Sequence, residues 1–232
     1  MRYARKTGGV QFVFALVAAL MLLSLLGGPA LADDLSPPWW PRQGITNLST
    51  SQQWEFFTNN AVLAPDGNTV PLHAGNGGAG PTAATSPNLV WSIGDGDGQW
   101  TNTSGIQGAI SLPIPNWIDN EPIKFMHLQA TYTGAAPFFT IESLSKTGFV
   151  GNFVTIQTGI HDFAANAPQF QHVEDWQIIP NPDWENLWLR IPPGTAVDQL
   201  IIDTISGPVP EPATLLACGL GGLLILGRRR GD

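Results

Sequence analysis

The sequence predicts an all-β fold, an antiparallel β-sandwich of jelly-roll type, for the central part of the chain. Between residues 33 and 206, short β-prone runs alternate with Gly, Pro, Asn and Asp, a pattern typical of sandwiches and barrels. No window there has the apolar period of an amphipathic helix. Many of the 20 prolines also separate these runs and disfavour long helices. We therefore expect two packed antiparallel sheets, flanked by an N-terminal signal helix and a C-terminal transmembrane helix.

Strands are expected where β-branched, aromatic and aliphatic residues cluster between turn residues. The longest run, Ile123–Tyr132, carries an alternating series on one face that begins with Lys124 and continues with apolar residues. Alternation with a period of two places such a series against the core. In chain order the predicted strands are Gln53–Phe57, Leu89–Ile93, Ala109–Leu112, Ile123–Tyr132, Phe138–Leu144, Phe153–Ile160, Val173–Ile179, Leu187–Ile191 and Gln199–Ile205.

Residues 33–49 precede the sandwich domain, which we place at residues 50–206. They are rich in proline and polar residues around the sequence PPWWP, Pro37–Pro41. Consecutive prolines favour an extended backbone, so we interpret this segment as an extended lead-in. Its tryptophans, Trp39 and Trp40, are expected to lie on the domain or on a ligand.

Charge and cysteine content narrow the class of protein. Residues 33–210 hold sixteen acidic and four basic residues, a formal charge of −12. A surface this acidic repels phosphate backbones, so a nucleic-acid partner is not expected. The single cysteine, Cys218, lies in a C-terminal apolar run. No disulfide is therefore expected in the central domain, and its stability must come from its core.

The N-terminus has the three parts of a secretory signal peptide. Arg2, Arg5 and Lys6 form a basic start, and Val10–Leu26 is an almost unbroken apolar run. Ala30–Ala32 then supplies the small-x-small pattern that signal peptidase accepts. We predict a signal peptide at residues 1–32 and export of the remaining chain across the inner membrane.

The C-terminus combines a rigid motif, a short apolar segment and a basic end. Prolines around a glutamate keep the backbone extended, as a processing enzyme requires of its substrate. The apolar run, residues 213–227, spans about 22 Å as a helix. Snorkelling arginines and local thinning can fit this length to a ~30 Å hydrocarbon core, with the arginines on the cytoplasmic side. The motif residues are Pro210, Glu211, Pro212, Arg228, Arg229 and Arg230.

This C-terminus resembles the PEP-CTERM sorting signal of Gram-negative bacteria over about the last 24 residues. The resemblance implies that residues 207–232 anchor the protein in the membrane and are processed by an exosortase, a membrane-embedded peptidase-like enzyme. Members of this group are typically exported proteins linked to exopolysaccharide and biofilm production. The implied location is the cell surface or the extracellular matrix. An ordinary tail anchor is the alternative, although it has no need of a rigid Pro-Glu-Pro motif.

One loop has the composition of a calcium site. Asp95 and Asp97 alternate with glycines in the sequence GDGDG, residues 94–98, as carboxylates do in calcium loops. An EF-hand needs an acidic residue at its twelfth position, which here is Ile106. Two interpretations remain, a structural calcium site completed by distant carbonyls and a plain hairpin turn, of which the turn is favoured.

All nine tryptophans lie in the central part of the chain. Indole rings stack on the apolar C–H faces of sugars, so exposed tryptophans suit a polysaccharide partner. Burial is expected for the tryptophans of predicted strands, whereas those in loops or at strand ends are candidate ligand-binding residues. The strand tryptophans are Trp54, Trp91, Trp176 and Trp188, and the ligand candidates are Trp39, Trp40, Trp100, Trp117 and Trp184.

Catalytic motifs give little support to an enzyme. The sequence contains no Gly-x-Ser-x-Gly elbow and no His-Glu-x-x-His. Asp119 and Glu121 would share a face of an extended segment, as a glycosidase pair requires, but such pairs are common in an acidic domain. Adjacent acids such as Glu174 and Asp175 point to opposite faces of a strand. We therefore expect a non-catalytic protein.

The sequence as a whole predicts an exported protein of the cell surface or the exopolysaccharide matrix, with glycan binding as its expected activity. Two alternatives remain open. One is a secreted hydrolase acting on matrix polysaccharide, and the other is a purely structural matrix component that binds calcium.

Overall fold

The structure, a computed structural model, describes residues 34–66, 81–94, 98–117, 119–165 and 167–207. In this part of the chain all regular structure is β-strand except one 3-10 turn, Gly44–Thr46. No helix of the described residues is long and apolar enough to cross a membrane. The predicted signal peptide, the Pro-Glu-Pro motif with its arginines, and Asp95 and Asp97 lie outside the described residues, so these expectations stay predictions.

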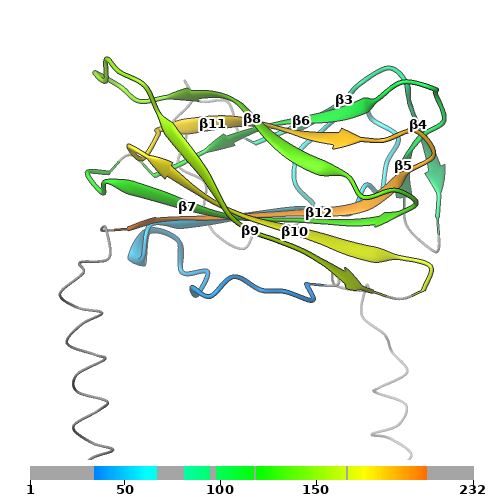
Figure 1. Cartoon of the computed structure of the whole chain (residues 1–232), viewed down its shortest axis with the longest axis horizontal. Helices are drawn as coiled ribbons and strands as arrows, with labels where there is room; N and C mark the ends of the chain where they lie inside the picture. Colours follow the sequence, from blue (N-terminus) through cyan, green and yellow to red (C-terminus); the bar gives the residue numbers. More distant parts are fainter. Residues whose placement is uncertain (1–33, 67–80, 95–97, 118, 166, 208–232) are drawn as a thin grey trace, which may run out of the picture. The chain divides into compact units, whose positions relative to one another are not determined.

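The strands form two antiparallel sheets of seven and five strands (Figure 1). The larger sheet contains β1 (Ser49–Trp54), β4 (Leu89–Ile93), β5 (Gly98–Asn102), β7 (Ile123–Thr133), β9 (Val154–Ala164), β10 (Phe170–Ile179) and β12 (Ala196–Gly207). The smaller sheet contains β2 (Val62–Leu63), β3 (Ala83–Thr85), β6 (Gly108–Pro115), β8 (Phe138–Ser145) and β11 (Trp184–Ile191). The larger sheet has the order β4-β5-β12-β7-β10-β9, with β1 also pairing with β12, and the smaller has the order β2-β3-β6-β11-β8.

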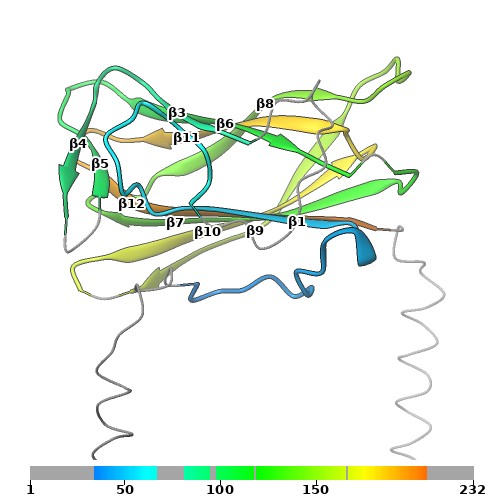
Figure 2. The same ribbon diagram turned by 180° about the vertical axis from the view of Figure 1, so that it is seen from behind.

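The two sheets face each other across one apolar core (Figures 1 and 2). Alternate residues of each strand point into this core, because successive side chains of a strand lie on opposite faces. The all-β class with two antiparallel sheets is therefore confirmed. Core residues of the central strands include Ile110, Leu112 and Ile114 of β6, Met126, Leu128 and Ala130 of β7, Leu187 and Leu189 of β11, and Leu200 and Ile202 of β12.

All nine predicted strands occur, with their ends shifted by a few residues. Three strands are missed by the sequence pattern: β2, β3 and β5. The first two are very short, and β5 is polar apart from Trp100. These strands form because the sheet supplies partners, as where Trp100 pairs with Trp91 of β4. Local propensity alone does not indicate them.

The lead-in, described from residue 34 onward, runs along the outer face of the larger sheet before it enters β1 (Figure 2). Its residues 34–43 form neither helix nor strand, and the 3-10 turn Gly44–Thr46 follows them before β1. Its contacts with β7, β10 and β12 build the candidate site.

Candidate functional site

The outer face of the larger sheet carries polar and aromatic side chains beneath the lead-in. Register places His127 of β7 between Asp175 of β10 and Asp203 of β12, and Phe125 of β7 between Gln177 and Ile205 of the same two strands. The neighbouring residues of each strand point the other way, into the core. The expectation that Glu174 and Asp175 face opposite sides of their strand is thus confirmed, since Glu174 is buried between the sheets.

The first anchor of the lead-in is an ion pair. Arg42 Nε and Nη2 each donate to one carboxylate oxygen of Asp203, both at 2.6 Å. The Asp203 side chain is fully buried, while that of Arg42 is 24% exposed. Two parallel hydrogen bonds between a guanidinium and a carboxylate define both distance and orientation. The pair therefore fixes the lead-in on β12.

The second anchor is His127, which lies between two hydrogen-bond acceptors. Its Nδ1 is 2.7 Å from Asp175 Oδ1, and its Nε2 contacts the backbone carbonyl of Ser36. A neutral imidazole donates from one nitrogen only, whereas the imidazolium donates from both. Burial by itself lowers the pKa of His127, but the hydrogen bonds to Asp175 and Ser36 outweigh it and raise the pKa above 6.5. In its protonated form the ring donates to both acceptors and ties β7, β10 and the lead-in together.

Between these anchors the lead-in forms an aromatic wall. The Trp39 ring meets the Trp40 ring edge to face at 5.2 Å and the Phe125 ring at 5.9 Å. Trp40 is 4% exposed and packs at 6.4 Å from the His127 ring, whereas Trp39 is 76% exposed. The buried indole thus holds the exposed one in place against the sheet.

A pocket of about 210 Å³ opens beside this wall, and we call it the Trp39 pocket. It is smaller than the ~300–1,000 Å³ of sites that enclose drug-sized ligands, so it suits a single ring of a longer chain. Its lining residues combine aromatic rings with hydroxyl, carboxylate and amide groups, which match the two kinds of surface that a sugar presents. Its lining residues are Trp39, Trp40, Phe125, Met126, Thr158, Asp175, Trp176 and Gln177.

The other predicted ligand tryptophans do not join the Trp39 pocket. The sequence predicts a loop or strand-end position for Trp100, but it lies inside β5 and is 5% exposed in the core, because β5 pairs with β4 and β12. Trp117 is 8% exposed and donates through Nε1 to the Ser49 carbonyl at 2.9 Å. Trp184 begins β11 on the opposite sheet and is half-buried. Only the lead-in pair is therefore brought together.

The carboxylates considered for catalysis form a turn. Asp119 Oδ1 accepts from the Glu121 backbone N–H and from Asn181 Nδ2, both at 2.8 Å. One oxygen of Asp119 is thereby engaged in local structure, an arrangement typical of an Asx turn. This geometry differs from two carboxylates that face each other across a substrate.

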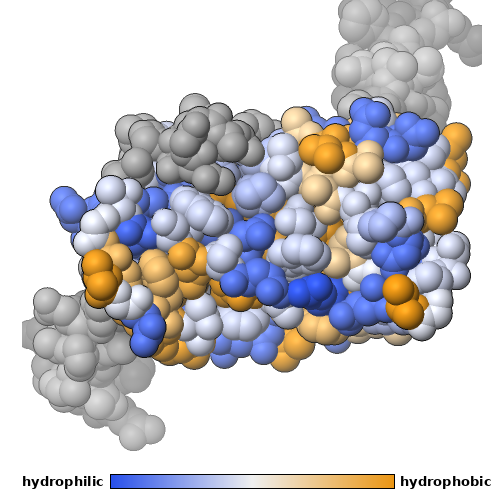
Figure 3. All heavy atoms as spheres, turned by 90° about the horizontal axis from the view of Figure 1, so that it is seen from above, coloured by the Kyte–Doolittle hydropathy of each residue, from blue (hydrophilic) through white to orange (hydrophobic). Residues whose placement is uncertain are grey.

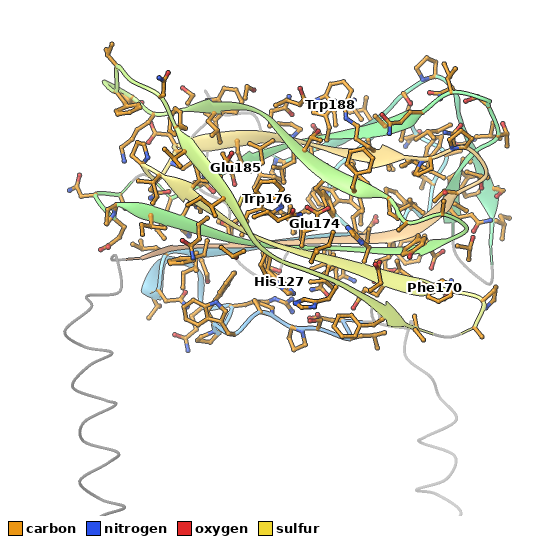
Figure 4. All side chains as sticks on the ribbon, in the orientation of Figure 1. His127, Phe170, Glu174, Trp176, Glu185 and Trp188 are labelled. Atoms are coloured by element: carbon orange, nitrogen blue, oxygen red, sulfur yellow. The ribbon has the colours of Figure 1, made fainter. Side chains whose placement is uncertain are left out.

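A second polar group, the Glu174 cluster, lies between the sheets and was not predicted (Figure 4). Glu174 accepts from His172 Nε2 at 2.9 Å, Trp176 Nε1 at 2.9 Å, Gln157 Nε2 at 2.7 Å and the Phe139 backbone N–H at 2.8 Å. Since Phe139 belongs to β8, the carboxylate joins the edges of the two sheets. The Glu174 side chain accepts all four hydrogen bonds and is 1% exposed, which indicates a structural role.

A third polar group, at Lys124, also lies in the core. Lys124 and Glu185 are both fully buried on facing sheets. Burial lowers the pKa of Lys124 to about 8, although the negative charges of Glu185 and Asp119 act to raise it. Burial also raises the pKa of Glu185 to about 7, although the positive charge of Lys124 acts to lower it. The period-two alternation of β7 correctly places Lys124 on the core face. The apolar residues around it would not by themselves indicate a lysine at this position.

We expect the stability of the chain to fall as pH rises, in part through His127. Its folded pKa is raised above 6.5, so its stabilising effect is complete below about pH 6.5 and is lost as pH rises through the folded pKa. The variant His127→Gln lacks this titration. Thermal midpoints of both proteins between about pH 5 and 8 should show a stability difference that shrinks as pH rises. A difference that stays constant would contradict the role of the imidazolium.

Comparisons of the chain with protein-family models, with curated proteins and with solved structures found no match. Within the described residues, no group of three or more His, Cys, Asp or Glu side chains is arranged to hold a metal ion. The candidate calcium site at Asp95 and Asp97, for which a plain turn is the favoured alternative, lies outside these residues. The function is therefore argued from the chemistry of the site itself.

Proposed function

We propose that this chain is an exported, non-catalytic protein of the cell surface or exopolysaccharide matrix, and that its Trp39 pocket binds polysaccharide. The domain in this proposal is a sandwich of jelly-roll type. Export through the signal peptide at residues 1–32 and sorting of residues 207–232 by an exosortase would deliver it to a carbohydrate-rich environment.

The observation that carries this proposal is the exposed but fixed position of Trp39. An indole that is 76% exposed gains little from burial in its own chain. Two edge-to-face contacts nevertheless hold it beside a pocket with a carboxylate, an amide and a hydroxyl. A ring fixed before binding loses little conformational entropy when a sugar stacks on it. This arrangement supports a platform for a carbohydrate ring.

The negative charge of the domain and of the Trp39 pocket supports an uncharged polysaccharide as the ligand. The central part of the chain has a formal charge of −12, and Asp175 lies in the Trp39 pocket itself. An anionic polymer would be repelled by this surface, most strongly at low ionic strength. Neutral hydroxyl groups, in contrast, can donate to Asp175 and accept from Gln177.

The engagement of the nearby carboxylates supports binding over hydrolysis. Asp175 pairs with His127, and Glu174 receives four hydrogen bonds. A general acid or nucleophile needs a carboxyl group that can reach the scissile bond. Glu174 is instead held in the core, while Asp175 lines the pocket with His127 as its partner.

We expect Trp39→Ala to weaken binding of hydroxyethyl cellulose, a soluble neutral polysaccharide, by roughly tenfold, or ~1.4 kcal/mol. The thermal midpoint should hardly change, because the side chain is mostly exposed. The matched control is Phe57→Ala, which removes an aromatic residue that is 53% exposed and outside the Trp39 pocket. Titrations of the full chain measure the affinities. Equal affinity of the Trp39 variant and the wild type would contradict the proposed site.

A further inference from the structure

The outer face of the smaller sheet carries a second row of aromatic and polar side chains along β11. Every other residue of this strand is half-exposed, while those between are buried. This alternation is the period-two pattern of a strand with one face on the core and the other facing outward. The outward residues, which define the β11 face, are Trp184, Asn186, Trp188 and Arg190.

The residues that flank the two tryptophans on the neighbouring strands are small. Trp188 lies between Ser111 of β6 and Thr140 of β8 in the sheet register. Trp184 lies between Pro115 and Ser145 in the same way. These four flanking residues are all smaller than an indole. At ~3.3 Å per residue the two are about 13 Å apart along the strand, so one extended sugar chain can contact both.

Trp188 is held in position by its polar neighbours. The guanidinium of Arg190 lies 4.7 Å from the centre of the Trp188 ring, a cation–π contact. Arg190 also donates to Thr140 Oγ1 at 3.3 Å and to Glu142. The positive charge of Arg190 and the negative charge of Glu142 therefore compensate each other next to the indole. This local neutrality, on a strongly acidic domain, is complementary to an uncharged chain and offers no attraction to a polyanion.

The β11 face and the Trp39 pocket lie on opposite sides of the domain. Trp188 is seen on the outer side of the smaller sheet, and His127 on the outer side of the larger sheet (Figure 4). Looking onto the smaller sheet, Figure 3 shows hydrophilic and hydrophobic residues interspersed. A large contiguous apolar patch, which would mark a protein-docking surface, is not seen in this view. Mixed polar surface with isolated indoles is more typical of carbohydrate recognition.

We propose that the β11 face is a second binding surface for uncharged polysaccharide, so that one molecule bridges two chains. This inference rests on the proposed function of the Trp39 pocket. A protein with two such faces cross-links a polysaccharide matrix, whereas a protein with one face only decorates it. Bridging gains strength from multivalency, since many weak contacts act together on polymers with repeated sites.

The test uses beads coated with hydroxyethyl cellulose and the full chain. Wild-type protein should clump the beads, while Trp188→Ala and Trp39→Ala should each bind to them without clumping. The double variant should not bind. Phe57→Ala should behave as the wild type does.

The outcomes separate the two proposals. Binding without clumping by the wild type, or unchanged clumping by Trp188→Ala, overturns the second surface and leaves the Trp39 pocket standing. Absence of any binding by the wild type overturns both. If Trp188→Ala changes the oligomeric state in size-exclusion chromatography and leaves bead binding intact, the β11 face joins copies of the chain and the inference is wrong.

Discussion

Replacing Glu174 with alanine is expected to lower the free energy of unfolding by about 3–5 kcal/mol. The change removes the acceptor for His172, Trp176, Gln157 and the Phe139 backbone N–H. Each donor would then be left without its partner in a site where Glu174 is 1% exposed. It would also remove one of the two carboxylates beside His172, whose other ring nitrogen is 2.9 Å from Asp162. Urea unfolding of the full chain measures the loss.

Two further variants sharpen this prediction. Glu174→Gln keeps the shape of the side chain but presents an NH₂ group to donors, so it should also destabilise strongly. Glu142→Ala is the matched control, because its carboxylate is 40% exposed and pairs with Arg190 at the surface. Such a pair contributes only ~0.2–1 kcal/mol. A loss below about 1 kcal/mol for Glu174→Ala would show that the cluster does not hold the sheet edges together.

Replacing Arg42 with alanine is the second change with a large expected effect. It leaves the fully buried Asp203 carboxylate without its bidentate guanidinium. Breaking a buried pair from one side costs about 3–5 kcal/mol, because a buried charge loses its compensation. The lead-in is also released from β12, so binding of hydroxyethyl cellulose should weaken together with stability.

The double variant Arg42→Ala with Asp203→Asn provides the control for this ion pair. A neutral amide at position 203 has no buried charge to compensate, so the double variant should be more stable than Arg42→Ala alone. Urea unfolding of the four proteins completes the cycle. Losses that simply add would show that the pair is not coupled, and would contradict its role as an anchor.

Much of the fold could be predicted from the sequence because strand patterns are local. The alternation in Ile123–Tyr132 indicates both a strand and its core face, and β7 follows it closely. For Trp100 the same alternation rule gives no indication of burial. Its strand is polar, and its place in the core depends on pairing with β4 and β12, which no local pattern reports.

The candidate site could be predicted only in part, because it is assembled across the chain. The proline-rich lead-in and its tryptophans indicate a segment lying on the domain, and Trp40 does so. The anchors, however, join residues up to 161 positions apart, as Arg42 and Asp203 are. Single-sequence reasoning carries no signal for such pairs. It likewise gives no reason for Glu174 on a core face, since a polar inward residue is explained only by its donors.

Hydrogen–deuterium exchange of the full chain, with and without hydroxyethyl cellulose, shows whether the lead-in and the larger sheet together form a polysaccharide-binding surface. Slower exchange is expected in residues 36–43 and 174–178 when the polysaccharide is present. Unchanged exchange in both segments, at concentrations where the chain is bound, would contradict such a surface.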